Sequence, residues 1–89
     1  LGYVSELIAM KVPRERLEQV AQIVSEYQGV THNYEREGDY NLWFAIGQET
    51  RSELDRILAD IESRAAVKEM LRLPTSRKFK IEVILPIEE

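Results

Sequence analysis

Residues 29–46, GVTHNYEREGDYNLWFAI, contain the only histidine and the only tryptophan of the chain, with two of its four tyrosines. Two segments of strand-forming residues, 30–36 and 40–46, flank Gly38-Asp39, a dipeptide that is typical of a hairpin turn. The stretch therefore predicts a β-hairpin. Because it lies between two segments of helical periodicity, this hairpin decides the fold, and it gathers the rare, chemically capable side chains in one place.

The residues before the hairpin predict a strand and a helix. Residues 3–12 are apolar and partly alternating, which is typical of a strand. Pro13 then begins a helix, since proline has no N–H to lose at the first helical position. Gly29 is a stop signal for this helix. Its apolar residues recur on one face, and they are Leu17, Val20, Ala21, Val24 and Tyr27.

The residues after the hairpin predict a second helix and two more strands. Thr50 and Glu53 have the spacing of a capping box, in which each side chain satisfies a free backbone N–H of the first turn. Strands over 67–73 and 79–85 follow the helix, separated by Pro74-Thr75-Ser76. The apolar face of this second helix comprises Leu54, Ile57, Leu58 and Ile61, and Ala65 and Ala66 close it.

The order strand, helix, strand, strand, helix, strand is that of an α+β, ferredoxin-like βαββαβ sandwich, here with an additional C-terminal strand. A chain of 89 residues is expected to form one domain, residues 1–89. Two helices can cover only one face of such a sheet, so the other face is left for solvent, another sheet or a ligand. We therefore expect the functional site on this open face.

Composition excludes several classes of function. The net charge is −4 and the pI about 5.1, which argues against direct nucleic-acid binding by this domain. The chain has no cysteine, so a reducing cytoplasm is the expected location, and no apolar run is long enough to span a membrane. A domain this small favours association with a second copy or a partner. It begins at Leu1 without methionine, so we expect a processed form or one domain of a longer protein.

The strand alternation predicts which hairpin side chains share the open face. With a two-residue turn, His32, Tyr34 and Arg36 of the first strand join Asn41 and Trp43 of the second. This set offers a group that titrates near neutral pH, a fixed cation, a phenol, an amide and a flat aromatic ring. Such an inventory suits an anionic, planar ligand.

Two alternatives remain open at this point. A three-residue turn would instead place His32 beside Leu42 and Phe44 in the core, although the even turn keeps Arg36 out of the core. Lone histidines in small domains are also more often structural, and Trp43 and Tyr34 could simply fill a dimer interface.

A second group of cations lies near the end of the chain. Five basic residues occur within 13 residues that contain a single acid, Glu69. Clustered cations can hold carboxylates, but the same pattern is typical of a solvated sheet edge that lysines protect from aggregation. No metal-ligand spacing, phosphate loop or nucleophile motif occurs, so no metal site is expected. The five basic residues are Lys68, Arg72, Arg77, Lys78 and Lys80.

These segments resemble the signature of the siroheme decarboxylases, a branch of the Lrp/AsnC-like proteins that acts in heme and d-type heme biosynthesis. The closing segment LRLPTSRKFKIEV (71–83) and the segment AMKVP (9–13) also resemble that family, so the resemblance covers essentially the whole chain. Full-length members carry a helix-turn-helix-like part before this region. The hairpin residues that match are Val30, Thr31, His32, Tyr34 and Arg36, then Tyr40, Asn41, Leu42 and Trp43. The matching residues of the closing segment are Leu73, Pro74, Arg77, Phe79, Lys80 and Ile81.

The resemblance implies removal of two acetate carboxyls from siroheme as carbon dioxide. It implies no separate cofactor, because the substrate carries its own iron, and it implies a homodimer or a heterodimer with a related subunit. His32 is then the expected proton donor. Arg36 is expected to clamp a carboxylate, as is Arg77, with Lys80 in a lesser role.

The same resemblance suggests roles for three further residues of the hairpin. Tyr34 would donate a hydrogen bond to the substrate. Trp43 would stack on the macrocycle or fill the interface between subunits. Asn41 would contact the substrate or fix the hairpin.

Two other functions fit the same sequence. One is a non-catalytic Lrp/AsnC-type module that binds an effector and oligomerises within a transcriptional regulator. The other is a tetrapyrrole-binding or assembly domain that keeps the pocket without catalysis.

Overall fold

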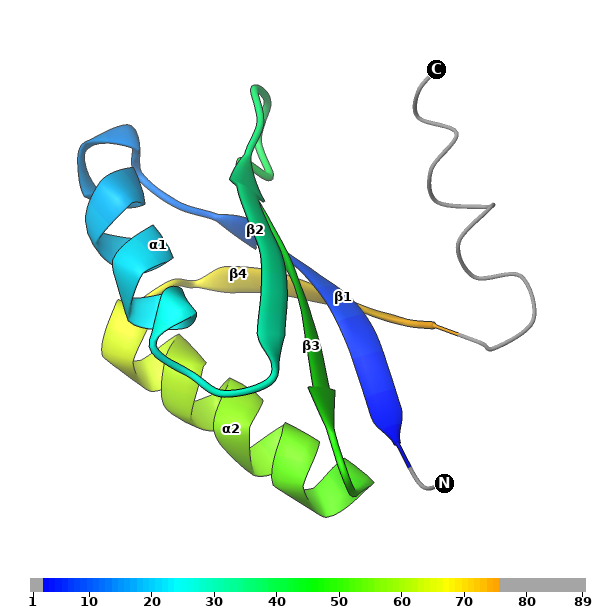
Figure 1. Ribbon diagram of the computed structural model, residues 1–89. Coiled ribbons are helices and arrows are strands. Elements are labelled where there is room, and N and C mark those ends of the chain that lie inside the picture. The colour runs from blue at the N-terminus through cyan, green and yellow to red at the C-terminus, as the bar shows by residue number, and fades with distance from the viewer. Residues whose placement is uncertain (1–2, 76–89) are drawn as a thin grey trace.

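The computed structural model describes residues 3–75 and shows a four-stranded antiparallel sheet with two helices against one face (Figure 1). The strand order is β2-β3-β1-β4, with β1 paired to both β3 and β4. This is the α+β, ferredoxin-like fold that the sequence predicts, while the additional strand predicted over 79–85 lies outside the described residues. The elements are β1 (Val4–Lys11), the 3-10 helix η1 (Arg14–Arg16), α1 (Leu17–Ser25), β2 (Val30–Glu35), β3 (Leu42–Gln48), α2 (Arg51–Ala65) and β4 (Glu69–Pro74).

Local signals set the ends of both helices. Thr50 caps α2 as predicted, because its Oγ1 accepts a hydrogen bond from the Glu53 N–H at 3.1 Å. Helix α2 ends at Ala65 and is capped by Ala66, which adopts the left-handed conformation. The start of α1 differs from the prediction. The Pro13 carbonyl accepts the N–H of Arg16 at 2.8 Å, so a 3-10 turn comes first and the α-helix begins at Leu17 instead of at Pro13.

Alternate residues of β1 and β3 face the helices and form the core. Ile8 lies opposite Phe44 and Met10 opposite Leu42, and all four are fully buried. Each such side chain contributes roughly 1.5–3 kcal/mol of transfer free energy when it is removed from water. The helices complete this layer with Val20, Val24, Leu54, Leu58, Ile61 and Ala65.

One carboxylate is buried at the margin of the core. Glu6 of β1 is 2% exposed and accepts hydrogen bonds from Arg72 Nε at 2.7 Å and Arg51 Nη1 at 2.6 Å. Burial by itself raises the pKa of Glu6, but the hydrogen bonds and charges of the two arginines outweigh it, so this pKa lies below its ordinary value. Arg72 also contacts Asp55 at 2.7 Å. The network therefore joins β1, β4 and the first turns of α2.

We expect Glu6→Gln to lower the free energy of unfolding by about 2 kcal/mol at neutral pH, because the two guanidinium groups lose their ionised partner. A carboxylate whose pKa is lowered by folding stabilises the fold above its unfolded-state pKa. That contribution is lost as the pH falls through the lowered pKa. Urea unfolding of wild type and variant over a pH series should therefore show their difference shrinking in acid.

Glu53→Gln is the matched control for this test. Glu53 forms an exposed ion pair with Arg56 at 3.5 Å, so its loss should cost less than about 0.5 kcal/mol. A difference between wild type and Glu6→Gln that stays constant down to the acid limit would contradict the assignment.

Candidate functional site

The hairpin turn is longer than predicted but keeps the predicted alternation near its tip. Tyr34 pairs with Trp43 and Glu35 with Leu42, and the Arg36 N–H donates to the Asn41 carbonyl at 2.9 Å. Residues 37–40 therefore connect the strands, so the predicted two-residue turn is wrong. Since four is also an even number, Tyr34 and Trp43 still lie together. Trp43 lies opposite Ala9 of β1, and neither residue belongs to the core cluster that packs against the helices. Tyr34 and Trp43 therefore lie on the face that the helices leave uncovered.

A β-bulge interrupts the alternation at His32. Between the pairs Thr31–Ala45 and Tyr34–Trp43, β2 uses one residue more than β3. His32 adopts a φ of 52°, in the left-handed region that costs a residue with a side chain about 1–2 kcal/mol. The prediction that His32 simply alternates with Tyr34 on one regular strand face is therefore wrong. His32 is nevertheless exposed, so it does not lie in the helix-covered core.

Asn33 connects this bulge to α1. Its Nδ2 donates to the Ala21 carbonyl at 3.1 Å and to Ser25 Oγ at 2.7 Å. Ser25 Oγ in turn donates to the same carbonyl at 2.9 Å. The side chain of Asn33 is therefore directed to the helix, on the side of the sheet opposite that of Tyr34.

A second asparagine holds the other strand of the hairpin. Asn41 Oδ1 accepts the Val12 N–H and its Nδ2 donates to the Val12 carbonyl, both at 2.9 Å. These two bonds fix the hairpin to the end of β1. Both the oxygen and the nitrogen of the Asn41 side-chain amide are therefore hydrogen-bonded within the protein. This agrees with a role of Asn41 in fixing the hairpin, one of the two roles suggested from the sequence.

Aromatic rings and cations gather at the hairpin end of the open face. Trp43 Nε1 donates to the Tyr40 carbonyl at 2.7 Å, which fixes the indole and leaves its ring as the contact surface. The Arg36 guanidinium lies 5.5 Å from the centre of the Tyr34 ring, a cation–π distance. Lys11 lies 5.5 Å from the centre of the Tyr40 ring. We call Tyr34, Arg36, Tyr40 and Trp43 the hairpin cluster; His32 lies two residues before Tyr34 in the same strand.

Charge around Lys11 is partly neutralised. Its Nζ contacts Glu69 at 3.2 Å, and the hydrogen bond and charge of Glu69 raise the pKa of Lys11. The Lys11 cation is thus already paired, whereas for Arg36 the structure records only the contact with a ring. Within residues 3–75, Arg36 is therefore the cation of the hairpin cluster that is best placed to receive a carboxylate.

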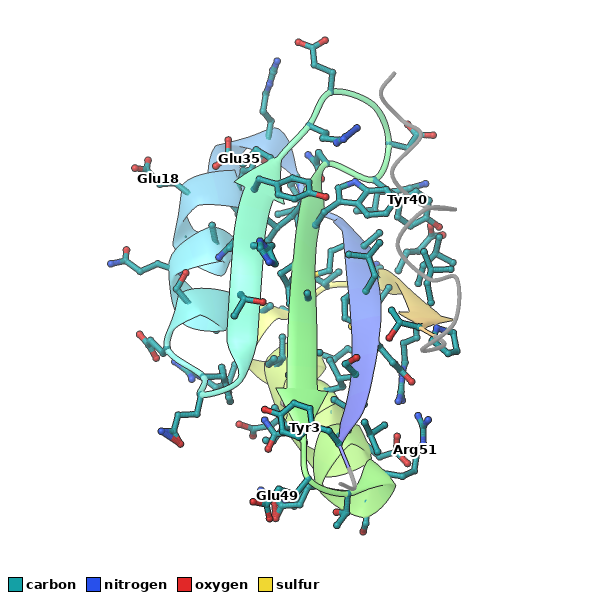
Figure 2. All side chains as sticks on the ribbon, turned by 45° about the vertical axis from the view of Figure 1, so that its right-hand side comes forward. Tyr3, Glu18, Glu35, Tyr40, Glu49 and Arg51 are labelled. Carbon is teal, nitrogen blue, oxygen red and sulfur yellow. The ribbon has the colours of Figure 1, made fainter. Side chains whose placement is uncertain are left out.

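The middle of the open face is apolar. Leu7 and Ala9 of β1 are buried there, while Leu71 and Leu73 of β4 are 41% and 37% exposed. Figure 2 looks onto this face, with Tyr40 near the hairpin end and Tyr3 near the opposite end. An uncovered surface of this kind is typical of an interaction site.

Of the basic group near the chain end, only Lys68 and Arg72 belong to the described residues. Arg72 lies on the helix-covered side, where it binds Glu6 and Asp55. Arg77 and Lys80, predicted to hold carboxylates, lie outside the described residues. Their proposed roles stay predictions.

A cleft at the far end of the sheet was not predicted from the sequence. It has a volume of about 840 Å³, and its walls include Tyr3, Gly29, Gly47, Glu49 and Arg56. The Tyr3 ring covers Gly47, where an added Cβ would come within 2.7 Å of it. The glycines at 29 and 47 were the available signal, because both sit where backbone or ring approaches closely.

Residues 3–75 contain neither a cluster of metal ligands nor a membrane-spanning helix. They contain no group of three or more histidine, cysteine, aspartate or glutamate side chains that could hold a metal ion. None of the helices in this part of the chain is long and apolar enough to cross a membrane.

The βαββαβ order and the four-stranded antiparallel sheet define a class of α+β domains, the ferredoxin-like domains. The family model described as the AsnC-like ligand binding domain matches residues 1–80, and the chain belongs to this family.

Known relatives confirm the more specific resemblance to the siroheme decarboxylases. The chain is 43% identical over 84 residues to the siroheme decarboxylase NirD subunit of Pseudomonas aeruginosa, covering 94% of this chain and 55% of that subunit. It is 47% identical over 89 residues to the siroheme decarboxylase of Hydrogenobacter thermophilus, covering 99% of this chain and 27% of that protein. The chain thus spans about half the length of the first relative and about a quarter of the second.

A solved structure shares the fold as well as the sequence. The crystal structure of the siroheme decarboxylase NirDL in complex with an iron-uroporphyrin III analogue matches with a TM-score of 0.76 and 47% sequence identity. The match covers 82% of this chain and 24% of that one.

The conformation of His32 leads to a stability prediction. Glycine adopts the left-handed conformation without steric cost, so we expect His32→Gly to raise the free energy of unfolding by about 0.5 kcal/mol. Thr31→Gly, one residue earlier in regular strand, should lower it by about 1 kcal/mol. Urea denaturation measures both, and equal losses in the two variants would contradict the bulge geometry.

Proposed function

We propose that this chain is a siroheme decarboxylase domain, which removes acetate carboxyls from siroheme in heme or d-type heme biosynthesis. The observation that carries the proposal is the hairpin cluster: Tyr34, Arg36 and Trp43, three of the residues that match the decarboxylase signature, lie together at one end of the sheet face that the helices leave uncovered. Relatives named siroheme decarboxylase, and the relative solved with an iron-uroporphyrin III analogue, support it.

The cluster suits a flat, anionic macrocycle. The exposed ring of Tyr34 and the indole of Trp43 are cross-strand neighbours, and together they offer an aromatic surface for stacking. Arg36 adjoins that surface with its cation on the Tyr34 ring, where it would give paired hydrogen bonds to a carboxylate. In this assignment Asn41 acts indirectly, because it fixes the strand that carries Trp43. We keep Arg77 and Lys80 as further carboxylate-binding residues on the strength of the resemblance.

In this reaction the protein has to bind the substrate and supply a proton. The bond between the acetate methylene carbon and its carboxylate breaks, carbon dioxide leaves, and the electron pair is delocalised into the pyrrole-type ring. A proton then adds to the methylene carbon and gives a methyl group. His32 is the proposed donor of that proton, since an imidazolium is the usual general acid near neutral pH. The macrocycle accepts the electron density itself, so no separate cofactor is proposed.

A second subunit would cover the apolar part of the open face. Leu71 and Leu73 are exposed on β4, beside the buried Leu7 and Ala9, and this area is continuous with the hairpin cluster. Stacking this face against a second copy, or against a related subunit, would bury it and would close one side of the substrate site. We place such a dimer in the cytoplasm.

One alternative function is favoured by a separate observation. The cleft between Tyr3, Gly29, Gly47 and the first turn of α2 would suit a small effector, which is what a regulatory AsnC-like module binds. The same cleft has no aromatic pair and is not continuous with the hairpin cluster. A domain that binds a tetrapyrrole without turnover is the remaining possibility.

One assay separates these functions. We expect the full chain, incubated with siroheme without oxygen, to give products whose masses show stepwise loss of carboxyl groups. His32→Ala should lower the rate by about 10²-fold or more while siroheme binding is retained. Glu35→Gln, at an exposed position of the same strand opposite Leu42, is the matched control and should keep most of the activity.

Each other outcome points to a different function. Tight siroheme binding by the wild type without product would favour a binding or assembly domain. A chain that ignores siroheme and responds to amino acids would overturn the proposal in favour of the effector module.

The proposed subunit contact has its own test. Leu73→Lys, at an exposed position of the edge strand β4 on the open face, should shift the chain from dimer to monomer in sedimentation velocity. Ala59→Lys introduces the same charge at an exposed position of α2 and should leave the dimer intact. Monomeric wild type, or dissociation by both variants, would contradict an interface on this face.

A further inference from the structure

His32 is held in a conformation that a regular hairpin would avoid. Its φ of 52° lies in the left-handed region, at the point where β2 carries one residue more than β3 between Thr31 and Tyr34. Backbone outliers of this kind persist only where the surrounding contacts impose them. A contact between β2 and another element must therefore hold His32 in this conformation.

The side chain of Asn33 makes the contacts that can hold the bulge in place. Its Nδ2 is bound by two acceptors on α1, the Ala21 carbonyl at 3.1 Å and Ser25 Oγ at 2.7 Å. In a regular strand residues 31 and 33 would share one face. Here Thr31 pairs on the open face while Asn33 reaches the helix on the other side. The extra residue needed for this reversal is His32.

We infer that Asn33 is a positioning residue for His32: by tying the bulge to α1, it holds His32 in the left-handed conformation and so fixes the direction in which the imidazole leaves the strand. The inference rests on the proposed function, because it gives the bulge a role in proton delivery. Without the tie, β2 can return to regular alternation, and the imidazole then leaves the strand in another direction. Misplacing a catalytic group by about 1 Å can cost roughly 10²-fold in rate.

A purely structural role makes a different prediction. If Asn33 only stabilises the fold, any equivalent hydrogen bond should matter equally. Gln48 supplies the comparison, since its Nε2 donates to the Gln28 carbonyl at 3.0 Å and joins the end of β3 to the loop between α1 and β2. Asn33→Ala and Gln48→Ala thus remove the same kind of bond, from a side-chain amide to a backbone carbonyl.

The experiment measures the two variants in the full chain with two readouts. The first is siroheme turnover: Asn33→Ala should lower kcat between about 10-fold and 100-fold with KM changed less than about threefold, while Gln48→Ala keeps both. The second is the nuclear Overhauser effect between the amide and α protons of His32, which is strong only at positive φ. It should weaken in Asn33→Ala and persist in Gln48→Ala. Ser25→Ala, which removes only one acceptor, gives a milder variant of intermediate effect and serves if Asn33→Ala does not fold.

The outcomes separate this inference from the proposed function. If wild type turns siroheme over and Asn33→Ala does so equally well, the positioning role is wrong and the proposed function stands. If the His32 signal is unchanged in Asn33→Ala, another contact holds the bulge and the inference is overturned. If wild type neither binds nor converts siroheme, the proposed function fails, and the role in proton delivery fails with it. Loss of turnover and of the signal in Asn33→Ala alone supports the inference.

Discussion

Two helices of 9 and 15 residues cover one face of a four-stranded sheet and leave the other uncovered. This constraint determines which strand side chains pack in the core and which lie on the open face. Facing the helices, β1 and β3 present Ile8, Met10 and Phe44, which form the core. Facing away, the same strands present Ala9 and Trp43. Because alternate residues of one strand serve both faces, the core that stabilises the fold also holds the aromatic surface in place.

Polar contacts secure the hairpin where apolar packing does not reach. Asn41 joins one strand of the hairpin to Val12 at the end of β1, and Asn33 joins the other strand to α1. A cluster placed on a hairpin tip alone would be mobile, since an isolated hairpin is marginally stable in water. The two asparagines give the hairpin cluster the rigidity that a binding site needs. The buried Glu6 network secures the opposite edge, where β4 meets α2.

Element order, the Thr50 cap, the core residues and the shared face of Tyr34 and Trp43 could all be predicted from the sequence, because they follow from periodicity and local capping. The bulge at His32 could not, since it depends on a contact between Asn33 and a helix 12 residues away in sequence. The partners of Arg72 could not be predicted for the same reason: a basic run cannot reveal that a buried Glu6 lies near it. The predicted length of the turn was wrong because Gly38-Asp39 fits a longer loop equally well. The cleft near Gly47 could not be predicted because residues far apart in the sequence form its walls.

The central claim is that the tetrapyrrole site lies at the hairpin end of the uncovered face. Paramagnetic broadening of nuclear magnetic resonance signals tests it most directly, with iron uroporphyrin III as the ligand and zinc uroporphyrin III as the diamagnetic control. The account predicts loss of the signals of residues 31–34 and of the Trp43 indole, while Ala59 and Glu62 on the outer side of α2 stay sharp. Broadening centred instead on Gly29, Gly47 and the start of α2, with the hairpin signals intact, would contradict it.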